Sequence, residues 1–229
     1  MGSNYSSKYD VDIVMCIDAT GSMGPLINMV KDNALSFYTD LTTKLAEKDK
    51  RVNELRVRVI AFRDYLADGD RAMLMSDFFK LPEQSAQFEA LVKSIEPDGG
   101  GDDPEDGLEA LGYAIKSKWN KGEGKKRHVI VVWTDDATHA LGFGASASNY
   151  PRKMAKNFKE LSEWWGVGQS ANGVMDRKSK RLLIYAPPKE YWTTIASTWD
   201  NALLFPSAAG QGLDDRTFAE ILDAICGSV

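Results

Sequence analysis

The strongest constraint on the fold comes from short apolar segments that have no polar face. Residues 128–134 read HVIVVWT and residues 11–17 read VDIVMCI, so apolar side chains occupy odd and even positions alike. Strands of this kind are buried on both faces, as in a parallel sheet that helices cover on each side. These two segments therefore predict an α/β fold.

Six segments are expected to form strands and six to form helices. The strands are expected at 11–17, 55–62, 72–79, 128–134, 181–186 and 202–205. The helices are expected in the run from Pro25 to Leu45 and at 84–95, 104–119, 151–165, 188–198 and 214–226. Their alternation predicts a three-layer, doubly wound, mostly parallel sheet of the Rossmann-like kind. The second and third strands are separated only by YLADGDR, which is too short for a parallel crossover, so one antiparallel edge strand is expected.

Length, charge and hydropathy predict one domain that binds neither nucleic acid nor membrane. The 229 residues suit a single large α/β domain at 9–229, with residues 1–8 as a disordered tail or cloning remnant. A net charge of −5 argues against a nucleic-acid binder, which needs a basic face. No apolar run approaches the roughly 18–20 residues of a membrane span. With only two cysteines and no signal peptide, a cytoplasmic location is expected.

Oxygen-bearing side chains follow several of the predicted strands. Ligands of open α/β sheets bind at the carboxyl ends of the strands, so these positions are the first place to look for a site. The candidates are Asp18, Thr20 and Ser22 after the first strand, Arg63 and Asp64 after the second, Asp102 and Asp103 in the loop PDGGGDDPEDG, and Asp135 and Asp136 after the fourth. Carboxylate and hydroxyl oxygens suit Mg²⁺ or Mn²⁺ rather than zinc. His139 stands alone and is expected at the surface or in support of a ligand.

The motif Asp18-x-Thr20-x-Ser22 resembles the D-x-S/T-x-S signature of von Willebrand factor A domains. The resemblance extends over nearly the whole chain, and FRDY, GGGDDPE and the Asp135 loop are most similar to intracellular members associated with protein kinases and phosphatases. These include alpha-kinase-linked and bacterial tellurium-resistance-associated proteins. The family's ligands form a metal-ion-dependent adhesion site.

The resemblance implies a set of metal ligands and a function. The ligands would be Asp18, Thr20, Ser22, Asp102 and Asp135, with Asp103 in place of Asp102 if the loop is offset by one. Arg63, Asp64, Asp103 and Asp136 would support the ligands or line the rim. The implied function is not enzymatic: it is Mg²⁺- or Mn²⁺-dependent binding of another protein, as an adaptor in a bacterial phosphorylation or tellurium-resistance-like stress-response system, where the partner would be a kinase or phosphatase.

Asp102 departs from the threonine that adhesion receptors have in this loop. Three carboxylates outweigh the charge of a divalent metal, so a partner's carboxylate would meet repulsion on the order of 1 kcal/mol. The sequence therefore predicts a site that is more structural, or that prefers a less acidic ligand, than the site of an adhesion receptor.

Two other interpretations remain open at this stage. The stretch DATGS also resembles the first loop of haloacid-dehalogenase-type Mg²⁺-dependent phosphotransferases, with Asp18 as the nucleophile and Asp135-Asp136 as a later magnesium pair. That chemistry needs a lysine and a serine or threonine at further strand ends, and FRDY supplies neither. The chain could also be a structural domain whose metal only stabilises the loops.

Overall fold

The fold is a single mixed sheet between two layers of helices. The computed structural model describes residues 7–100 and 104–229. In these residues the strands are β1 (Ser7–Asp18), β2 (Lys50–Phe62), β3 (Met73–Met75), β4 (Phe79–Leu81), β5 (Lys125–Trp133), β6 (Lys180–Ala186) and β7 (Ala202–Pro206). The α-helices are α1 (Gly24–Asn33), α2 (Phe37–Glu47), α3 (Ser85–Lys93), α4 (Gly107–Ile115), α5 (Phe158–Trp165), α6 (Trp192–Thr198) and α7 (Phe218–Ser228).

The sheet has the doubly wound, mostly parallel topology that the sequence predicts. Its strand order is β3-β2-β1-β5-β6-β7, and β4 also pairs with β2. β1, β2, β5, β6 and β7 are parallel, whereas β3 and β4 run antiparallel to β2 at the edge. The single edge strand expected at 72–79 is thus two short strands with different partners on β2.

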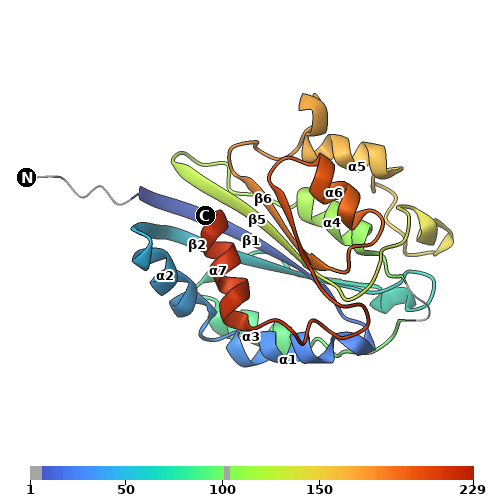
Figure 1. Ribbon diagram of the computed structural model, residues 1–229, viewed down its shortest axis with the longest axis horizontal. Coiled ribbons are helices and arrows are strands. Elements are labelled where there is room, and N and C mark those ends of the chain that lie inside the picture. The colour runs from blue at the N-terminus through green and yellow to red at the C-terminus, as the bar shows by residue number, and fades with distance from the viewer. Residues whose placement is uncertain (1–6, 101–103) are drawn as a thin grey trace, which may run out of the picture.

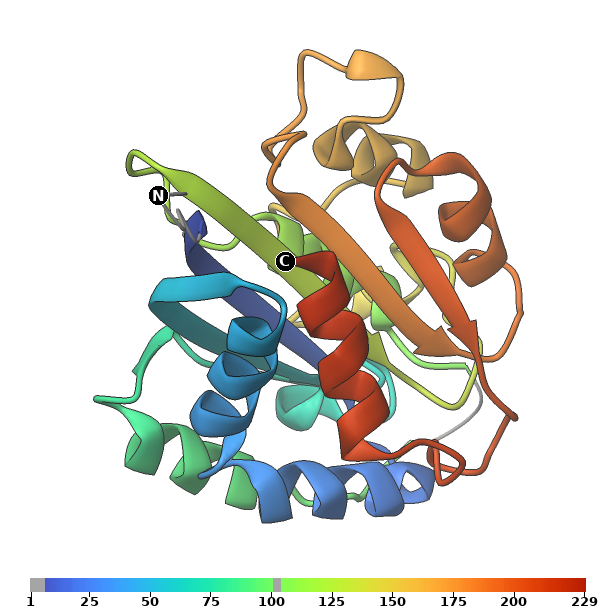
Figure 2. The ribbon, with the colours of Figure 1, turned by 60° about the vertical axis from the view of Figure 1, so that its left-hand side comes forward.

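Helices cover both faces of the sheet, as the apolar strands require. Figure 1 shows α1, α2, α3 and α7 on one side of the sheet and α4, α5 and α6 on the other. Alternate residues of β1 serve the two layers: Ile13 and Met15 belong to the first core, and Val14 and Cys16 to the second. The turned view in Figure 2 shows α7 lying across the middle of the sheet. No helix in the described residues is long and apolar enough to cross a membrane.

The long helix expected from Pro25 to Leu45 is wrong in one respect: a turn at 34–36 divides it into α1 and α2. Near the break, the side chain of Asn33 donates to the Met29 carbonyl and the Ser36 hydroxyl donates to the Asn33 carbonyl. Such local side-chain hydrogen bonds compete with the regular helix. Val30, Ala34 and Phe37 remain buried across the break, so the apolar spacing is that of one continuous helix.

Four other helices begin later than expected. α5 starts at Phe158 rather than at 151, and α6 starts at Trp192 rather than at 188. α4 starts at Gly107 rather than at 104, so Pro104 and Glu105 lie in the preceding loop, where Glu105 forms an isolated β-bridge with Thr138. α7 starts at Phe218 rather than at 214, because Thr217 caps it through a reciprocal hydrogen-bond pair with Glu220.

The chain topology defines where a ligand site is expected. The chain leaves β1 through α1 and α2 to reach β2 on one side, and it returns past α3 and α4 to β5 on the other side. The direction of winding therefore reverses between β1 and β5. In doubly wound sheets the crevice at the carboxyl ends of such a strand pair is the usual ligand site.

Candidate metal centre at the carboxyl ends of β1 and β5

The loop after β1 holds three oxygen-bearing side chains in a hydrogen-bonded turn. The buried carboxylate of Asp18 accepts hydrogen bonds through Oδ1 from the Thr20 amide (3.0 Å) and the Thr20 hydroxyl (2.6 Å). Its Oδ2 accepts from the Thr134 hydroxyl at 2.7 Å. Ser22, two residues further, is exposed. Asp18 is thus fixed inside the fold, while the hydroxyl of Ser22 lies at the surface.

Asp135, after β5, joins the first loop directly. Its Oδ1 accepts a hydrogen bond of 3.0 Å from the Ser22 hydroxyl, across 113 positions of sequence. The Asp135 side chain is buried, like that of Asp18. The structure therefore brings together Asp18, Thr20, Ser22 and Asp135, four of the five ligands that the resemblance implies. Asp102, the fifth, and its alternative Asp103 lie outside the described residues.

A further loop, which the sequence did not predict as part of the site, contacts Asp135 from the other side. The amide of Gly212 donates to Asp135 Oδ2 at 2.8 Å, and the amide of Gly210 donates to the Asp135 carbonyl at 2.8 Å. Gly212 has a positive φ of 58°, and a Cβ built there would lie 2.3 Å from the Ser22 carbonyl oxygen. Only glycine fits this approach, so the loop after β7 is part of the construction of the site.

Glu105 is another residue of this region that the sequence analysis did not assign to the site. Its side chain is buried, and Oε2 has no hydrogen-bond partner within the described residues. A Cβ on Gly100 would lie 2.9 Å from Glu105 Oε1 and 3.1 Å from Thr20 Cγ2. The carboxylate of Glu105 is therefore beside Gly100 and Thr20. The signal that could have located it was the glycine run before it, which lets a backbone pass close to a site.

The electrostatics of this cluster favour a cation. Burial raises the pKa of Asp18 to about 6, against the opposing hydrogen bonds from Thr20 and Thr134. Burial, and next the charge of Asp18, raises the pKa of Glu105 to about 9. No salt bridge within residues 7–100 and 104–229 reaches Asp18, Glu105 or Asp135. The buried carboxylates thus form no salt bridge with a basic side chain of the described residues, and Oε2 of Glu105 has no hydrogen-bond partner among them. Carboxylate and hydroxyl oxygens in such surroundings suit a hard divalent metal ion.

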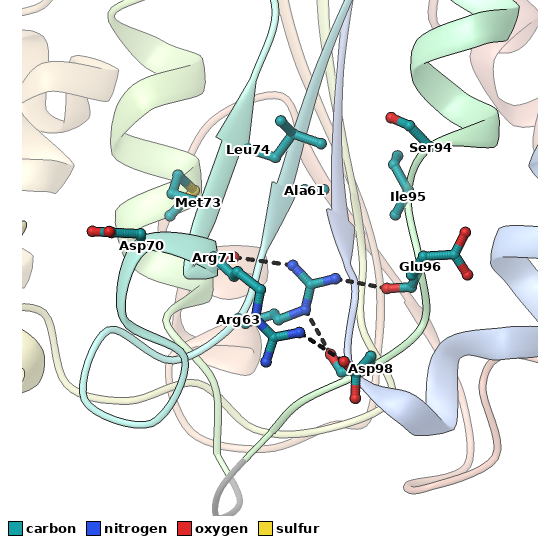
Figure 3. A pocket seen from close by; sticks show the side chains of 10 residues that line it. All are labelled: Ala61, Arg63, Asp70, Arg71, Met73, Leu74, Ser94, Ile95, Glu96 and Asp98. Atoms are coloured by element: carbon teal, nitrogen blue, oxygen red, sulfur yellow. Dashed lines mark hydrogen bonds and ion pairs between the residues drawn. The ribbon is translucent and has the colours of Figure 1, made fainter.

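Arg63 holds the loops of the site together through backbone carbonyls. Its Nε donates to the carbonyls of Ala19 (3.1 Å) and Asp98 (2.6 Å), Nη1 donates to Arg71 (3.0 Å) and Nη2 to Glu96 (2.6 Å). Figure 3 shows the guanidinium between Glu96, Asp98 and Arg71. Arg63 lines a surface cavity of about 390 Å³, together with residues of β3 and of the loop after α3. Because Ala19 lies between Asp18 and Thr20, Arg63 fixes the first metal loop to the segment that leads into the glycine run.

Asp64, Asp136 and His139 occupy different surroundings. Asp64 is fully buried and contacts His139, with 2.9 Å between Oδ2 and Nε2, so the expectation of a surface position for His139 is wrong. Asp136 is half-buried, and its Oδ1 accepts from the Ala137 amide at 2.5 Å. Neither aspartate hydrogen-bonds to Asp18, Thr20 or Ser22 among the bonds of the described residues.

Both carboxylate oxygens of Asp18 are engaged in hydrogen bonds. They accept from Thr20 or Thr134, and the side chain is buried. These hydrogen bonds orient the carboxylate, as outer-shell partners do for a metal ligand. This geometry supports the metal-site interpretation over the phosphotransferase one.

Comparisons with known proteins agree with this topology. No protein-family model matches the chain. The alpha-protein kinase vwkA of Dictyostelium discoideum is 25% identical over 141 residues, which are 62% of this chain and 21% of the kinase. The pilus adhesin SpaC of Lactobacillus rhamnosus GG, in its open conformation, superposes with a TM-score of 0.53 at 13% identity. That superposition covers 95% of this chain and 30% of SpaC.

A von Willebrand factor type A structure from Catenulispora acidiphila superposes with a TM-score of 0.48 at 12% identity, covering 94% of this chain and 42% of that one. The chain thus spans about a fifth of the kinase and less than a third of the adhesin. At this low identity, the likeness to SpaC concerns the fold alone.

Proposed function

We propose that the chain, whose motifs resemble those of von Willebrand factor A domains, binds another protein through a divalent metal at the carboxyl ends of β1 and β5. The proposed ligands are Asp18, Thr20, Ser22, Asp135 and, from the undescribed segment, Asp102, with Glu105 beside them. When bound, Mg²⁺ or Mn²⁺ would supply a Lewis-acidic position for an oxygen of the partner. The proposed role is not enzymatic.

The observation that carries this proposal is the hydrogen bond between Ser22 and Asp135. It joins loops from two neighbouring strands and places an exposed hydroxyl above buried carboxylates. A turn that served only to cap the next helix would use its side chains on that helix's amides. Instead, neither Thr20 before the short 3₁₀ turn nor Met23 before α1 makes a side-chain capping hydrogen bond.

The proposed partner is a component of a phosphorylation system. The likeness to an alpha-protein kinase over 62% of the chain supports this choice, although the chain covers only a fifth of that kinase. A bacterial, tellurium-resistance-like setting in the cytoplasm is a further part of the proposal that rests on the sequence resemblance. The proposed partner's ligand is less acidic than a glutamate or aspartate, because Asp18, Asp102 and Asp135 together would already outweigh the charge of a divalent metal.

The first test is a thermal melt of chelator-treated protein with and without Mg²⁺ or Mn²⁺. At a metal concentration of a hundred times the dissociation constant, the free energy of unfolding should rise by about 2.7 kcal/mol. For a chain of this size, Tm should increase by about 5–10 °C. Ser22→Ala, which removes one exposed hydroxyl ligand, should lose most of this increase, and Asp18→Ala should lose all of it.

Ser94→Ala is the matched control for Ser22→Ala, because Ser94 is also exposed and lies at the end of α3. It should keep the full metal-dependent increase. An equal increase in wild type, Ser22→Ala and Asp18→Ala would place the metal elsewhere and contradict the proposed site.

A second experiment separates a binding role from a purely stabilising metal. Wild type and Ser22→Ala are immobilised, and proteins captured from lysate in Mg²⁺ or in chelator are identified by mass spectrometry. A partner that wild type captures only in Mg²⁺, and that Ser22→Ala does not capture, supports metal-dependent binding. Capture that is equal in both buffers, while the metal still raises Tm, would show that the metal only stabilises the domain.

A further inference from the structure

A second cluster of ligand-type side chains lies beneath the loops that follow β2 and β5. It consists of Asp64 after β2, Asp106 at the start of α4 and His139 after β5, and one ligand atom from each lies within 4.8 Å of the other two. Asp64 and Asp106 are 0% exposed and His139 is 6% exposed. None of the hydrogen bonds among the described residues links these three to Asp18, Thr20, Ser22 or Asp135. This cluster is therefore a separate feature from the proposed Mg²⁺ site.

The hydrogen bonds of the cluster leave ligand capacity unused. Asp64 Oδ1 accepts from the amides of Leu66 and Ala67, and Asp64 Oδ2 faces His139 Nε2. Asp106 Oδ2 accepts from the Tyr65 amide at 2.7 Å. Asp106 Oδ1, by contrast, has no partner in the part of the chain that the structure describes, although its side chain is fully buried. A buried carboxylate oxygen without a partner is costly, and native proteins rarely retain one without a ligand or water.

The shortage of basic side chains around the cluster also favours a bound cation. No lysine or arginine of the described residues pairs with Asp64 or Asp106, and Arg63, next to Asp64, directs its guanidinium to four backbone carbonyls instead. Glu109, one turn along α4 from Asp106, is also buried and has an unpaired Oε2 among the described residues. Burying several carboxylates without a cation is unfavourable, whereas a bound dication would offset their charge.

The residue types select the metal. One imidazole nitrogen and two carboxylate oxygens supply three of the four ligands that Zn²⁺ takes, whereas Mg²⁺ prefers oxygen ligands and keeps several waters. The ring of His139 is held in place by stacking on Phe143, with 3.9 Å between ring centroids. We propose that Asp64, Asp106 and His139 bind a structural Zn²⁺ that ties the loop after β2, the start of α4 and the loop after β5 to one another.

The test compares wild type with Asp106→Asn and His139→Gln after chelation and removal of the chelator. The side-chain oxygen that Asp106→Asn retains could still accept from the Tyr65 amide, so that variant should fold. The apoproteins are titrated with Co²⁺, which reports imidazole and carboxylate ligands by its visible absorption, and then with Zn²⁺. We expect wild type to bind one ion and to melt at a higher temperature with micromolar Zn²⁺. Both variants should bind Zn²⁺ more than about a hundredfold more weakly, which exceeds the effect of about 10–100-fold expected of a residue that only orients a ligand.

Ser22→Ala separates this proposal from the proposed function. It should lose the Mg²⁺ response and keep the Zn²⁺ response, whereas Asp106→Asn should show the reverse. If Zn²⁺ leaves the melting of wild type unchanged, the cluster does not bind Zn²⁺. A higher melting temperature for Asp106→Asn would then show that the amide removes the cost of burying the Asp106 carboxyl group. The missing Zn²⁺ response would overturn the zinc site without touching the Mg²⁺ site.

Discussion

Replacing Arg63 with methionine should lower the free energy of unfolding by about 3–4 kcal/mol. Arg63 is only 7% exposed, and its guanidinium donates to the carbonyls of Ala19, Arg71, Glu96 and Asp98. Methionine fills much of the same volume but leaves these carbonyls without their donor. The bond to Ala19 is buried and the other three are part-buried. A buried unsatisfied group costs about 1–3 kcal/mol before relaxation. Urea unfolding followed by fluorescence measures the loss as a lower midpoint at unchanged slope.

Arg71→Met is the matched control. Arg71 contacts the same loop through Asp98, at 2.6 Å, but its side chain is 58% exposed and that of Asp98 is 65% exposed. Exposed ion pairs contribute about 1 kcal/mol or less, so this variant should unfold close to wild type. Equal losses from the two substitutions would mean that the buried carbonyl contacts of Arg63 have no special weight.

Arg63 should also influence the proposed metal. Its contact with the Ala19 carbonyl fixes the backbone between Asp18 and Thr20. Residues that orient metal ligands typically change affinity by about 10–100-fold. In calorimetric titrations, Mg²⁺ should therefore bind Arg63→Met about tenfold or more weakly, while Arg71→Met keeps the wild-type affinity.

The part of the site that the sequence predicts is the part that strand topology alone determines. Asp18 and Asp135 each follow a strand that is apolar on both faces, and adjacent parallel strands end at the same edge. The meeting of Ser22 with Asp135 follows from that rule without knowledge of any side-chain contact. The layered fold and the antiparallel edge follow equally from apolar patterning and from a loop too short for a crossover.

The parts that were missed depend on contacts between distant segments. Glu105 was expected in a helix, but its pairing with Thr138 keeps it in the loop, and no local pattern encodes that pairing. His139 follows β5 alone in the sequence, and only the fold places it against Asp64 and near Asp106. The role of Gly212 beside Asp135 could not be predicted from the sequence either. A glycine in a polar loop predicts a turn, but it does not predict which residue the turn contacts.

Gly212→Ala should be the most damaging single-methyl addition at the site. The residue has φ of 58°, and the added Cβ would lie 2.3 Å from the Ser22 carbonyl oxygen and 2.9 Å from Pro25 Cδ. The left-handed backbone costs about 1–2 kcal/mol for alanine, and forcing atoms into a packed space adds about 1–3 kcal/mol. We expect a total loss of about 3–4 kcal/mol by urea unfolding. Because the Gly212 amide donates to Asp135 Oδ2, Mg²⁺ affinity should also fall by about tenfold or more.

Gly210→Ala separates the steric effect from the backbone effect. Gly210 lies in the same loop with φ of 68°, and no atom lies within 4 Å of a Cβ built there. The hydrogen bond from its amide to the Asp135 carbonyl would remain. The free energy of unfolding of this variant should therefore fall by only about 1–2 kcal/mol, and Mg²⁺ should bind as it does to wild type. If both alanine variants lose the same stability and keep the same Mg²⁺ affinity, the close approach of Gly212 to the Ser22 backbone contributes nothing. The loop after β7 would then only connect β7 to α7 and would not support the metal ligands.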